Sequence, residues 1–320
     1  MRRVLLLLAL LTPFTATAQR IYRIAVIERE PALVVDPNVQ SLLQGFKELG
    51  YREHKDFSLY YESADGRDAR YPALCKEVVK RKVDLIVTRG TAATQACKRA
   101  TSSIPILFAG VADPVSDGLV ADIGHPGGNV TGIMYASGPL VTAARVELLR
   151  ELFPQIAMIG VIANLGGQEL PRQRQQAESA ARQAGIGWRL FDVRSVADLQ
   201  TAFAQAANDR VEAMYVALDS LTESNRRLVG SLGLKHRLPV LAGETAFVEA
   251  GSLISYGADT PGQYKRVAAI ADRIFRGANP ADIPVERPTV FSLAVNLKTA
   301  NALGVRVPPS LLSRADRVIQ

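Results

Sequence analysis

One stretch, residues 83–114, constrains the fold more than any other because it has the pattern of a complete strand–helix–strand unit. Residues 83–88 are a short, mostly β-branched run, which is typical of a strand buried on both faces. The spacing then predicts a helix over 92–100 and a second apolar strand over 106–109. Two parallel strands joined through a helix indicate a sheet with helices packed on its faces.

In such a unit, the ends of the strands and the beginning of the helix lie at the same edge of the sheet. We therefore expect Gly90, Thr91, Ala92 and Asp113 to line one rim. Thr91 is a suitable N-cap, and free N–H groups at Ala92 and Ala93 would attract an anion such as a carboxylate. The alternative is the same unit with an empty rim.

Strands alternate with helices twice along the chain, in halves of similar size joined near 135–139. This alternation predicts an α/β protein with two doubly wound parallel-sheet lobes joined by a hinge. We expect 19–136 plus 258–286 to form lobe 1 and 137–257 to form lobe 2. The last segment, 287–320, reads as a strand with short helices, and its lobe assignment stays open.

Two lobes of this kind leave a cleft between the ends of their strands, where several turns can converge. Beyond the rim described above, the candidate ligand contacts follow other predicted strands or close them: Glu28, Asn164, Asp219, Ser220, Glu244 and Tyr256. Ordinary roles remain as alternatives. The carboxylates of Asp219 and Glu244 could be solvated, Asp113 could stabilise its own turn, and Tyr256 could pack at the hinge.

The first 18 residues have the pattern of a secretory signal peptide. Arg2 and Arg3 precede an apolar run, and residues 16–18 fit a small-x-small cleavage site ending at Ala18. The apolar run is too short to span a bilayer, and no cysteine follows for lipid attachment. We predict an exported protein that is located in the periplasm.

Two cysteines, Cys75 and Cys97, lie on the predicted helices before and after the strand at 83–88. In a sheet of strand order 2-1-3-4-5 these helices share a face, and export permits oxidation. A disulfide between them would contribute roughly 3 kcal/mol in the chain-entropy model, and two buried free thiols are the alternative. No His/Cys grouping has metal-ligand spacing, so we expect neither a metal nor another cofactor.

The charge pattern and the missing catalytic motifs argue against two functional classes. The net charge is +7, but the basic residues are scattered among acidic ones and form no stripe with aromatics, so nucleic acid is not an expected partner. No nucleophile elbow and no Cys–His pairing occur, so we do not expect an enzyme. A two-domain α/β enzyme remains an alternative, because a catalytic pair can be distant in sequence.

Six stretches across nearly all of the mature chain carry a more specific pattern: GFKELGY (45–51), VDLIVTRGTAAT (83–94), IPILFAGVADPV (104–115), HPGGNVTG (125–132), RLPVLAGETAFVEAGSLISYGAD (237–259) and NLKTANALGVRVPPSLLSRAD (296–316). They resemble the ABC-transporter substrate-binding proteins whose best-known members serve importers of tryptophan and related amino acids. The resemblance implies a type I periplasmic-binding-protein fold with two lobes and a hinge.

The resemblance also implies a function and a set of contacts. Gly90, Thr91 and Ala92 would receive a ligand carboxylate, and Asp219 would lie near a ligand amino group. Only Asn164 matches the Asn-Pro-Asn turn of relatives, and Ser220 stands where they often have Asn. The chain would be a monomeric periplasmic component of an ABC importer, with an inner-membrane permease as partner. It would bind an amino acid or a similar small carboxylate and close by hinge motion. The alternative is a ligand-sensing module for a membrane receptor or kinase.

Overall fold

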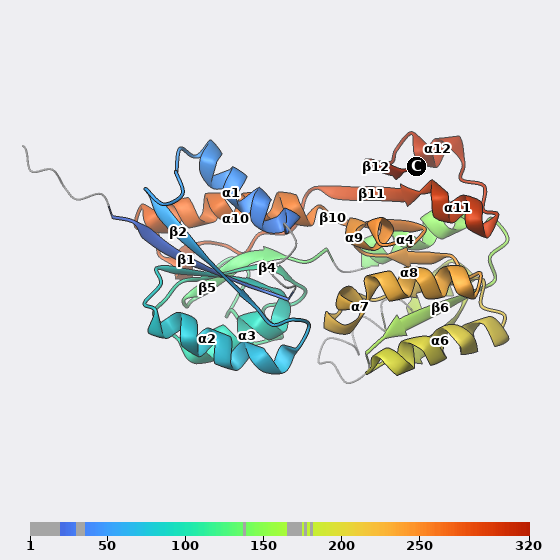
Figure 1. Ribbon diagram of the computed structural model, residues 1–320, viewed down its shortest axis with the longest axis horizontal. Helices are drawn as coiled ribbons and strands as arrows, with labels where there is room; N and C mark the ends of the chain where they lie inside the picture. Colours follow the sequence, from blue (N-terminus) through green and yellow to red (C-terminus); the bar gives the residue numbers. More distant parts are fainter. Residues whose placement is uncertain (1–19, 30–35, 137–138, 165–174, 176–177, 180–181) are drawn as a thin grey trace, which may run out of the picture.

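The computed structural model describes residues 20–29, 36–136, 139–164, 175, 178–179 and 182–320. These residues form two lobes side by side, each a twisted sheet covered by helices on both faces (Figure 1). The predicted signal peptide lies outside the described residues. None of the helices in the described part of the chain has the length and apolar character that a membrane crossing needs.

Lobe 1 contains a five-stranded parallel sheet of order β2-β1-β3-β4-β5, the order that the sequence predicts for its first half. Its strands carry long apolar runs because helices cover both faces. The strands are β1 (Tyr22–Glu28), β2 (Phe57–Ser63), β3 (Leu85–Arg89), β4 (Ile106–Val111) and β5 (Val130–Met134). The helices are α1 (Pro37–Glu48), α2 (Tyr71–Lys80), α3 (Gly90–Ala100) and α10 (Thr260–Phe275), with short 3-10 turns η1 (Asp68–Arg70) and η2 (Pro280–Asp282).

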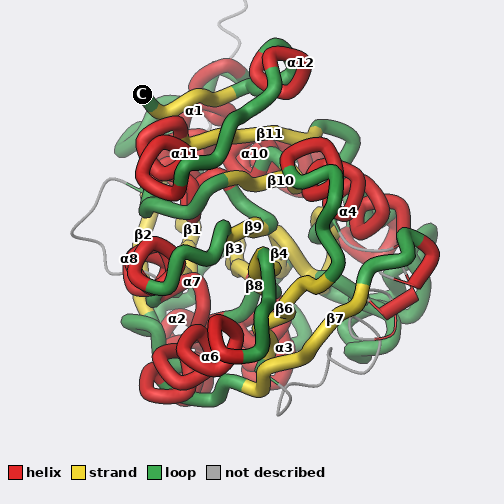
Figure 2. Tube along the Cα trace, turned by 90° about the vertical axis from the view of Figure 1, so that its right-hand side faces the viewer, coloured by secondary structure: helices red, strands yellow, loops and turns green. Residues whose placement is uncertain are grey.

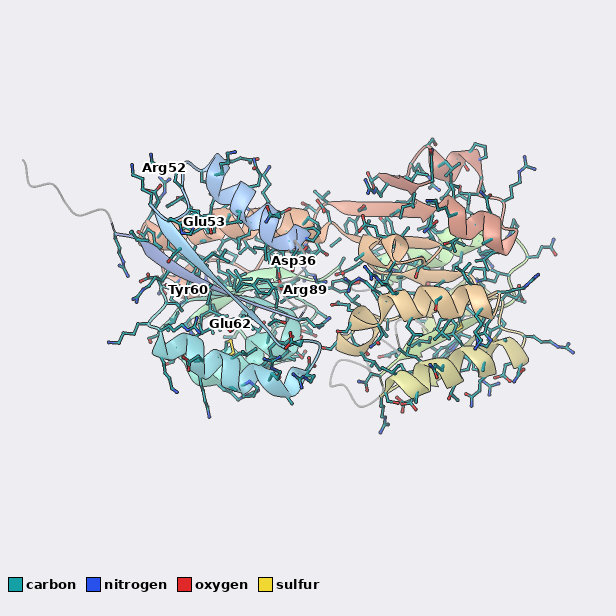
Figure 3. The ribbon with its side chains drawn as sticks, viewed as in Figure 1. Asp36, Arg52, Glu53, Tyr60, Glu62 and Arg89 are labelled. Carbon is teal, nitrogen blue, oxygen red and sulfur yellow. A yellow bond between two sulfur atoms is a disulfide. The ribbon has the colours of Figure 1, made fainter. Side chains whose placement is uncertain are left out.

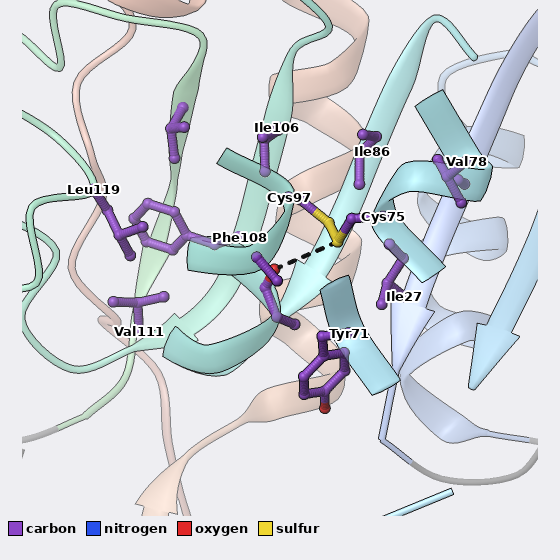
Figure 4. Packing of buried hydrophobic residues seen from close by; sticks show 14 of the residues in the cluster. Ile27, Tyr71, Cys75, Val78, Ile86, Cys97, Ile106, Phe108, Val111 and Leu119 are labelled. Atoms are coloured by element: carbon purple, nitrogen blue, oxygen red, sulfur yellow. Dashed lines mark hydrogen bonds between the residues drawn. A yellow bond between two sulfur atoms is a disulfide. The ribbon is translucent and has the colours of Figure 1, made fainter. Parts of the chain in front are cut away.

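The two faces of this sheet have separate cores. Helices α1 and α10 pack on one face around Phe46 and Tyr264. Helices α2 and α3 pack on the other, where a disulfide joins Cys75 to Cys97 next to Phe108 (Figure 4). The cross-link ties together the two helices that flank β3 in sequence.

Lobe 2 contains a seven-stranded sheet of order β12-β11-β10-β9-β8-β6-β7. Its strands are β6 (Met158–Ala163), β7 (Gly187–Asp192), β8 (Ala213–Val216), β9 (Val240–Ala242), β10 (Ile254–Ala258), β11 (Phe291–Asn296) and β12 (Arg317–Ile319). The helices are α4 (Pro139–Leu152), α6 (Val196–Asn208), α7 (Ser220–Ser224), α8 (Arg226–Lys235), α9 (Thr245–Glu249), α11 (Leu297–Leu303) and α12 (Pro309–Leu312). Figure 2 views this lobe end-on, with α6 and α8 on one side of the sheet and α4 on the other.

The C-terminal segment, which the sequence leaves unassigned, adds β11 and β12 to the edge of the lobe 2 sheet. Strand β11 runs antiparallel to β10, so this sheet is mixed and not wholly parallel as predicted. The direction reverses because the chain returns from lobe 1 through residues 287–290. It therefore enters the sheet from the end at which β10 leaves it.

Three crossovers join the lobes. The first leaves β5 at Tyr135, the second links β10 to α10 through Asp259, and the third leads from Glu286 into β11. The last two are tied together by a hydrogen bond, in which the Asp259 N–H donates to the Val290 carbonyl at 3.1 Å. The two lobes are thus connected by three segments of the chain, two of which are hydrogen-bonded to each other.

Candidate functional site

Two arginines occupy the edge of lobe 1 that faces lobe 2. Arg29 directly follows β1 and Arg89 ends β3. Because β1 pairs with β3 in parallel register, with Ile27 opposite Thr88, the two arginines emerge at the same edge. Figure 3 labels Arg89 at this position, beside the gap between the lobes. The ends of these two strands thus give lobe 1 a positively charged rim.

Two glutamates face them from lobe 2. Glu244 follows β9 and is the N-cap residue of α9, although its side chain makes no capping bond. Glu223 lies in the short helix α7, which begins soon after β8. Strands β8 and β9 are parallel neighbours, so the segments that follow them also share an edge. Lobe 2 therefore presents a negatively charged rim.

The opposite rims meet in ion pairs that cross between the lobes. Arg89 Nη2 donates to both carboxylate oxygens of Glu244, at 2.9 and 2.8 Å, and lies 3.5 Å from Glu223 Oε1. Arg29 Nη1 donates to Glu223 Oε2. We call Arg29, Arg89, Glu223 and Glu244 the interlobe charge cluster. Their side chains are 9–15% exposed, so each charge depends on its partner for the solvation it lost on burial.

Two hydroxyl groups add polar contacts around the cluster. Ser220 Oγ in lobe 2 donates to both oxygens of Asp68 in lobe 1, at 2.8 and 2.9 Å. Thr260 Oγ1, at the start of α10, donates to Glu244 Oε1 at 3.2 Å. Of these four residues, the sequence predicts Ser220 and Glu244 as candidate ligand contacts. In the structure both already bridge the lobes.

Helix α3 begins beside the cluster, but its cap differs from the prediction. The helix starts at Gly90, and Arg89 is the N-cap residue, so the assignment of Thr91 as N-cap is wrong. Gly90 has a φ of +74°, which lets the chain turn into the helix earlier than the pattern suggests. Thr91 Oγ1 instead donates to Asp117 Oδ2 at 3.1 Å. The first turn, which includes Ala92, still begins at the edge of lobe 1 that faces lobe 2.

The start of α3 is attractive to anions for two reasons. A helix N-terminus carries partial positive charge and N–H groups without intrahelical partners. In addition, the Arg29 guanidinium lies close by, since a Cβ atom placed on Gly90 would be 3.7 Å from Arg29 Nη2. Nearby carboxylates stabilise the positive charge of Arg89. Burial lowers the pKa of Arg89, but Glu244 and Glu28 outweigh this and raise it above its ordinary value.

Glu28, another predicted contact, lies at the end of β1 but is engaged within lobe 1. The residue is 1% exposed, and its carboxylate accepts a hydrogen bond from the Tyr264 hydroxyl on α10. Burial raises the pKa of Glu28 to about 7, and nearby Arg89 opposes this rise. Glu28 is therefore a buried titratable group just behind the charge cluster.

Asp113 and Asp219 each accept a hydrogen bond from the backbone of the turn that they begin. Asp113 Oδ1 accepts from the Ser116 N–H at 3.2 Å. Asp219 Oδ1 accepts from the Thr222 N–H at 2.7 Å and forms a reciprocal capping box at the start of α7. Asp219 Oδ2 is buried and has no hydrogen-bond partner among the residues that the structure describes. Burial raises the pKa of this carboxyl, although Thr222 opposes the rise. This oxygen could accept from a ligand donor.

Asn164 and Tyr256 lie elsewhere on lobe 2. Asn164 directly follows β6, at the same end of the sheet as the negative rim. Tyr256 is inside β10, where its ring stacks on Phe291 with the centroids 5.7 Å apart. Its carbonyl accepts from Arg145 Nε at 2.8 Å. The Tyr256 ring thus packs against its neighbour on β11, and its role as a ligand contact stays a prediction.

Sequence reasoning missed three of the four members of the charge cluster: Arg29, Arg89 and Glu223. The two arginines could have been predicted, because each stands at the end of an apolar strand, where a parallel sheet presents its ligand edge. Glu223 gave no such signal, because the short helix that carries it was not predicted. Among the described residues, no group of three or more His, Cys, Asp or Glu side chains could hold a metal ion.

Comparison with known proteins gives consistent matches. Residues 23–319 match the family model described as ABC transporter substrate binding protein. A protein of Clostridioides difficile named "Tyrosine-binding protein" is 26% identical over 278 residues, which are 86% of this chain and 79% of that protein. A Streptococcus pneumoniae ABC domain in complex with L-Trp superposes with a TM-score of 0.85 at 27% identity, covering 94% of this chain and 100% of that one. A conserved domain protein from Vibrio cholerae has a TM-score of 0.85 at 28% identity, covering 93% and 100%.

Proposed function

Since the chain belongs to the family of ABC transporter substrate-binding proteins, we propose that it is the exported component of an importer and that it delivers a small zwitterion, an amino acid or a close analogue. It would act in the periplasm and present its loaded form to an inner-membrane permease. The C. difficile relative named for tyrosine and the structure solved with L-Trp support an amino acid as the ligand.

The observation that carries this proposal is the opposite charge of the two rims. An amino acid has a carboxylate and an ammonium group on the same carbon, so it can contact both rims at once. Its carboxylate would bind Arg29, Arg89 and the start of α3. Its ammonium group would bind Glu223 and the buried Oδ2 of Asp219.

Closure would follow from the same contacts. The arginines and glutamates already pair directly across the gap, so the closed arrangement is electrostatically balanced before a ligand enters. A zwitterion inserted between them replaces each protein–protein ion pair by a protein–ligand pair and adds burial of its own side chain. The ligand shifts the lobes toward closure only by the difference between its affinities for the closed and the open form.

A thermal-shift screen of the mature chain against amino acids, organic acids, sugars and nucleosides tests the ligand class. A ligand at one hundred times its Kd stabilises the folded protein by about 2.7 kcal/mol, which shifts the melting temperature measurably. We expect stabilisation by one amino acid or a small group of similar ones. Stabilisation by uncharged sugars or nucleosides alone would refute the proposal.

A charge-neutral variant tests the site. Glu223→Gln keeps the size of the side chain but removes a negative charge that would face the ligand ammonium group, so we expect the affinity to fall by at least about tenfold. The matched control is Glu249→Gln, which removes an exposed carboxylate of the same lobe whose nearest cation is Arg317 at 3.7 Å. Equal affinities of the two variants, measured by calorimetry, would place the ammonium subsite elsewhere.

A further inference from the structure

The disulfide of lobe 1 lies directly behind the first turn of α3, where the ligand carboxylate would bind. Cys75 and Cys97 are both fully buried, and they join α2 to α3. Cys75 Sγ lies 3.9 Å from the carbonyl oxygen of Ala93, which belongs to the first turn of α3 (Figure 4). The cross-link therefore contacts the turn whose free N–H groups attract an anion.

The same face of α2 carries a tyrosine that contacts Arg29. Tyr71 begins α2 and Cys75 follows four residues later, so the two side chains lie one above the other on the helix. Tyr71 is 1% exposed. Burial raises the pKa of Tyr71, whereas Arg29 opposes this rise through its charge and through a side-chain hydrogen bond with the hydroxyl. Tyr71 thus holds one of the two cationic side chains that would bind the carboxylate.

Arg29 lies between the beginnings of the two helices. Its guanidinium contacts Tyr71 on α2, and its Nη2 would be 3.7 Å from a Cβ atom placed on Gly90, the first residue of α3. The separation of α2 and α3 therefore sets how closely the guanidinium approaches the N–H groups at the start of α3. A carboxylate that binds to both at once needs this separation to be fixed before it arrives.

Besides the disulfide, small side chains on α3 make its contact with α2. The apolar residues that α3 buries next to its cysteine are Ala93 and Ala96, and alanine removes little apolar surface from water. On its other side, α3 is attached to the loop after β4, where Lys98 Nζ donates to the Gly118 carbonyl at 2.6 Å. Without the cross-link, α3 would stay attached to that loop but could move relative to α2.

From these observations we propose that the disulfide between Cys75 and Cys97 is a positioning element of the carboxylate site. It fixes α2 and α3 at the separation at which Tyr71 holds Arg29 next to the start of α3, and the protein binds its amino acid tightly only when the cross-link is formed. The identity of the ligand rests on the proposed function, whereas the placement of the two helices does not.

Amide hydrogen exchange of the full mature chain without ligand tests the placement of α3. The test variant replaces Cys75 and Cys97 together by alanine. The matched control is Leu42→Ala, which opens a cavity under α1 on the opposite face of the same sheet and so also destabilises lobe 1. We expect peptides from α3 to exchange at least about tenfold faster in the disulfide variant than in the control. Equal exchange of α3 in the two variants would overturn the proposal.

Calorimetry then tests the effect on binding, with the amino acid that stabilises the wild type most in the thermal-shift screen as the probe. At a temperature where all variants are folded, the disulfide variant should bind this amino acid at least about tenfold more weakly than the wild type, because the rim is no longer preorganised. Leu42→Ala should bind it as the wild type does. Unchanged affinity of the disulfide variant would refute the dependence of binding on the cross-link.

A second substitution separates positioning from general loosening. Tyr71→Phe removes only the hydroxyl that holds Arg29, leaves the disulfide in place, and should weaken binding by about tenfold. The control Tyr60→Phe removes a hydroxyl from the middle of β2 and should leave the affinity unchanged. Because the disulfide acts through Tyr71, adding Tyr71→Phe to the disulfide variant should cause little further loss. Losses that add in full would contradict the positioning role.

Failure of the proposed function would look different from failure of the positioning role. If no amino acid stabilises the wild type, the ligand class is wrong, and hydrogen exchange still decides whether the disulfide places α3. If an amino acid binds the wild type and the disulfide variant equally well, the proposed function stands and the disulfide only stabilises the fold.

Discussion

Replacing Glu28 by glutamine should change how the stability of the protein depends on pH. Burial raises the pKa of this carboxyl from 4.5 to about 7 in the folded state. Below pH 4.5 the carboxyl is protonated in both states, so it contributes no pH dependence. Between pH 4.5 and 7 the folded state binds more protons than the unfolded state, so the free energy of unfolding falls as the pH rises. Above pH 7 the carboxyl is ionised in both states, and the free energy of unfolding falls no further because of it.

The size of the effect follows from the two pKa values. The difference between about 7 and 4.5, at 1.36 kcal/mol for each pKa unit, corresponds to roughly 3 kcal/mol. Glutamine has nearly the same shape and can still accept the hydrogen bond from the Tyr264 hydroxyl. Glu28→Gln should therefore match the wild type near pH 4.5 and exceed its stability by up to roughly 3 kcal/mol at pH 8.

Urea unfolding at four pH values between 4.5 and 8 measures this difference directly. The control is Glu53→Gln, which changes an exposed glutamate of the same lobe and should leave the pH dependence as it is in the wild type. A stability difference that is constant over this pH range, or a wild type that is more stable than Glu28→Gln at pH 8, would show that Glu28 does not titrate as the structure indicates.

Three further substitutions test the fold. Replacing Cys75 and Cys97 together by alanine should lower the free energy of unfolding by roughly 3 kcal/mol, and an unchanged urea midpoint under oxidising conditions would contradict the role of the cross-link. Gly132→Ala would place a Cβ atom 2.2 Å from the Phe108 carbonyl oxygen. We expect the free energy of unfolding to fall by more than about 3 kcal/mol. A wild-type melting temperature would refute the close approach of β4 and β5. Ser195→Ala removes the cap that accepts from the Asp198 N–H at 3.2 Å and should cost about 1 kcal/mol, whereas no change would show that the cap is replaced by water.

Strand and helix alternation predicted the architecture well, because the period of the apolar residues reports which faces are buried. The runs at 83–88 and 106–109 became β3 and β4, and the repeated alternation became two lobes. Very short elements were missed, among them α7, α9 and the terminal strand β12, because they are too short to show an apolar period. The antiparallel direction of β11 was also missed, because it depends on a crossover from the other lobe and leaves no local pattern.

The candidate site was predicted less completely, because the sequence shows which residues follow strands but not which partners they meet. Ser220 and Glu244 reach the gap between the lobes as expected, but each already has a protein partner there. Thr91 follows its strand as expected and yet is not the N-cap, because Gly90 allows the helix to begin earlier. The pairing of Arg89 with Glu244 joins residues 155 positions apart, and no local signal relates them.

If the two opposed rims recognise both charges of a zwitterion, removing either charge from the ligand should weaken binding, and calorimetric titration with charge-deleted analogues measures this loss. The amino acid identified by the thermal-shift screen would be compared with its decarboxylated amine and with its deaminated acid. We expect each analogue to bind at least about tenfold more weakly, since each leaves buried charges of one rim without a partner. An analogue that lacks either charge and binds as tightly as the amino acid itself would show that the protein does not recognise both charges.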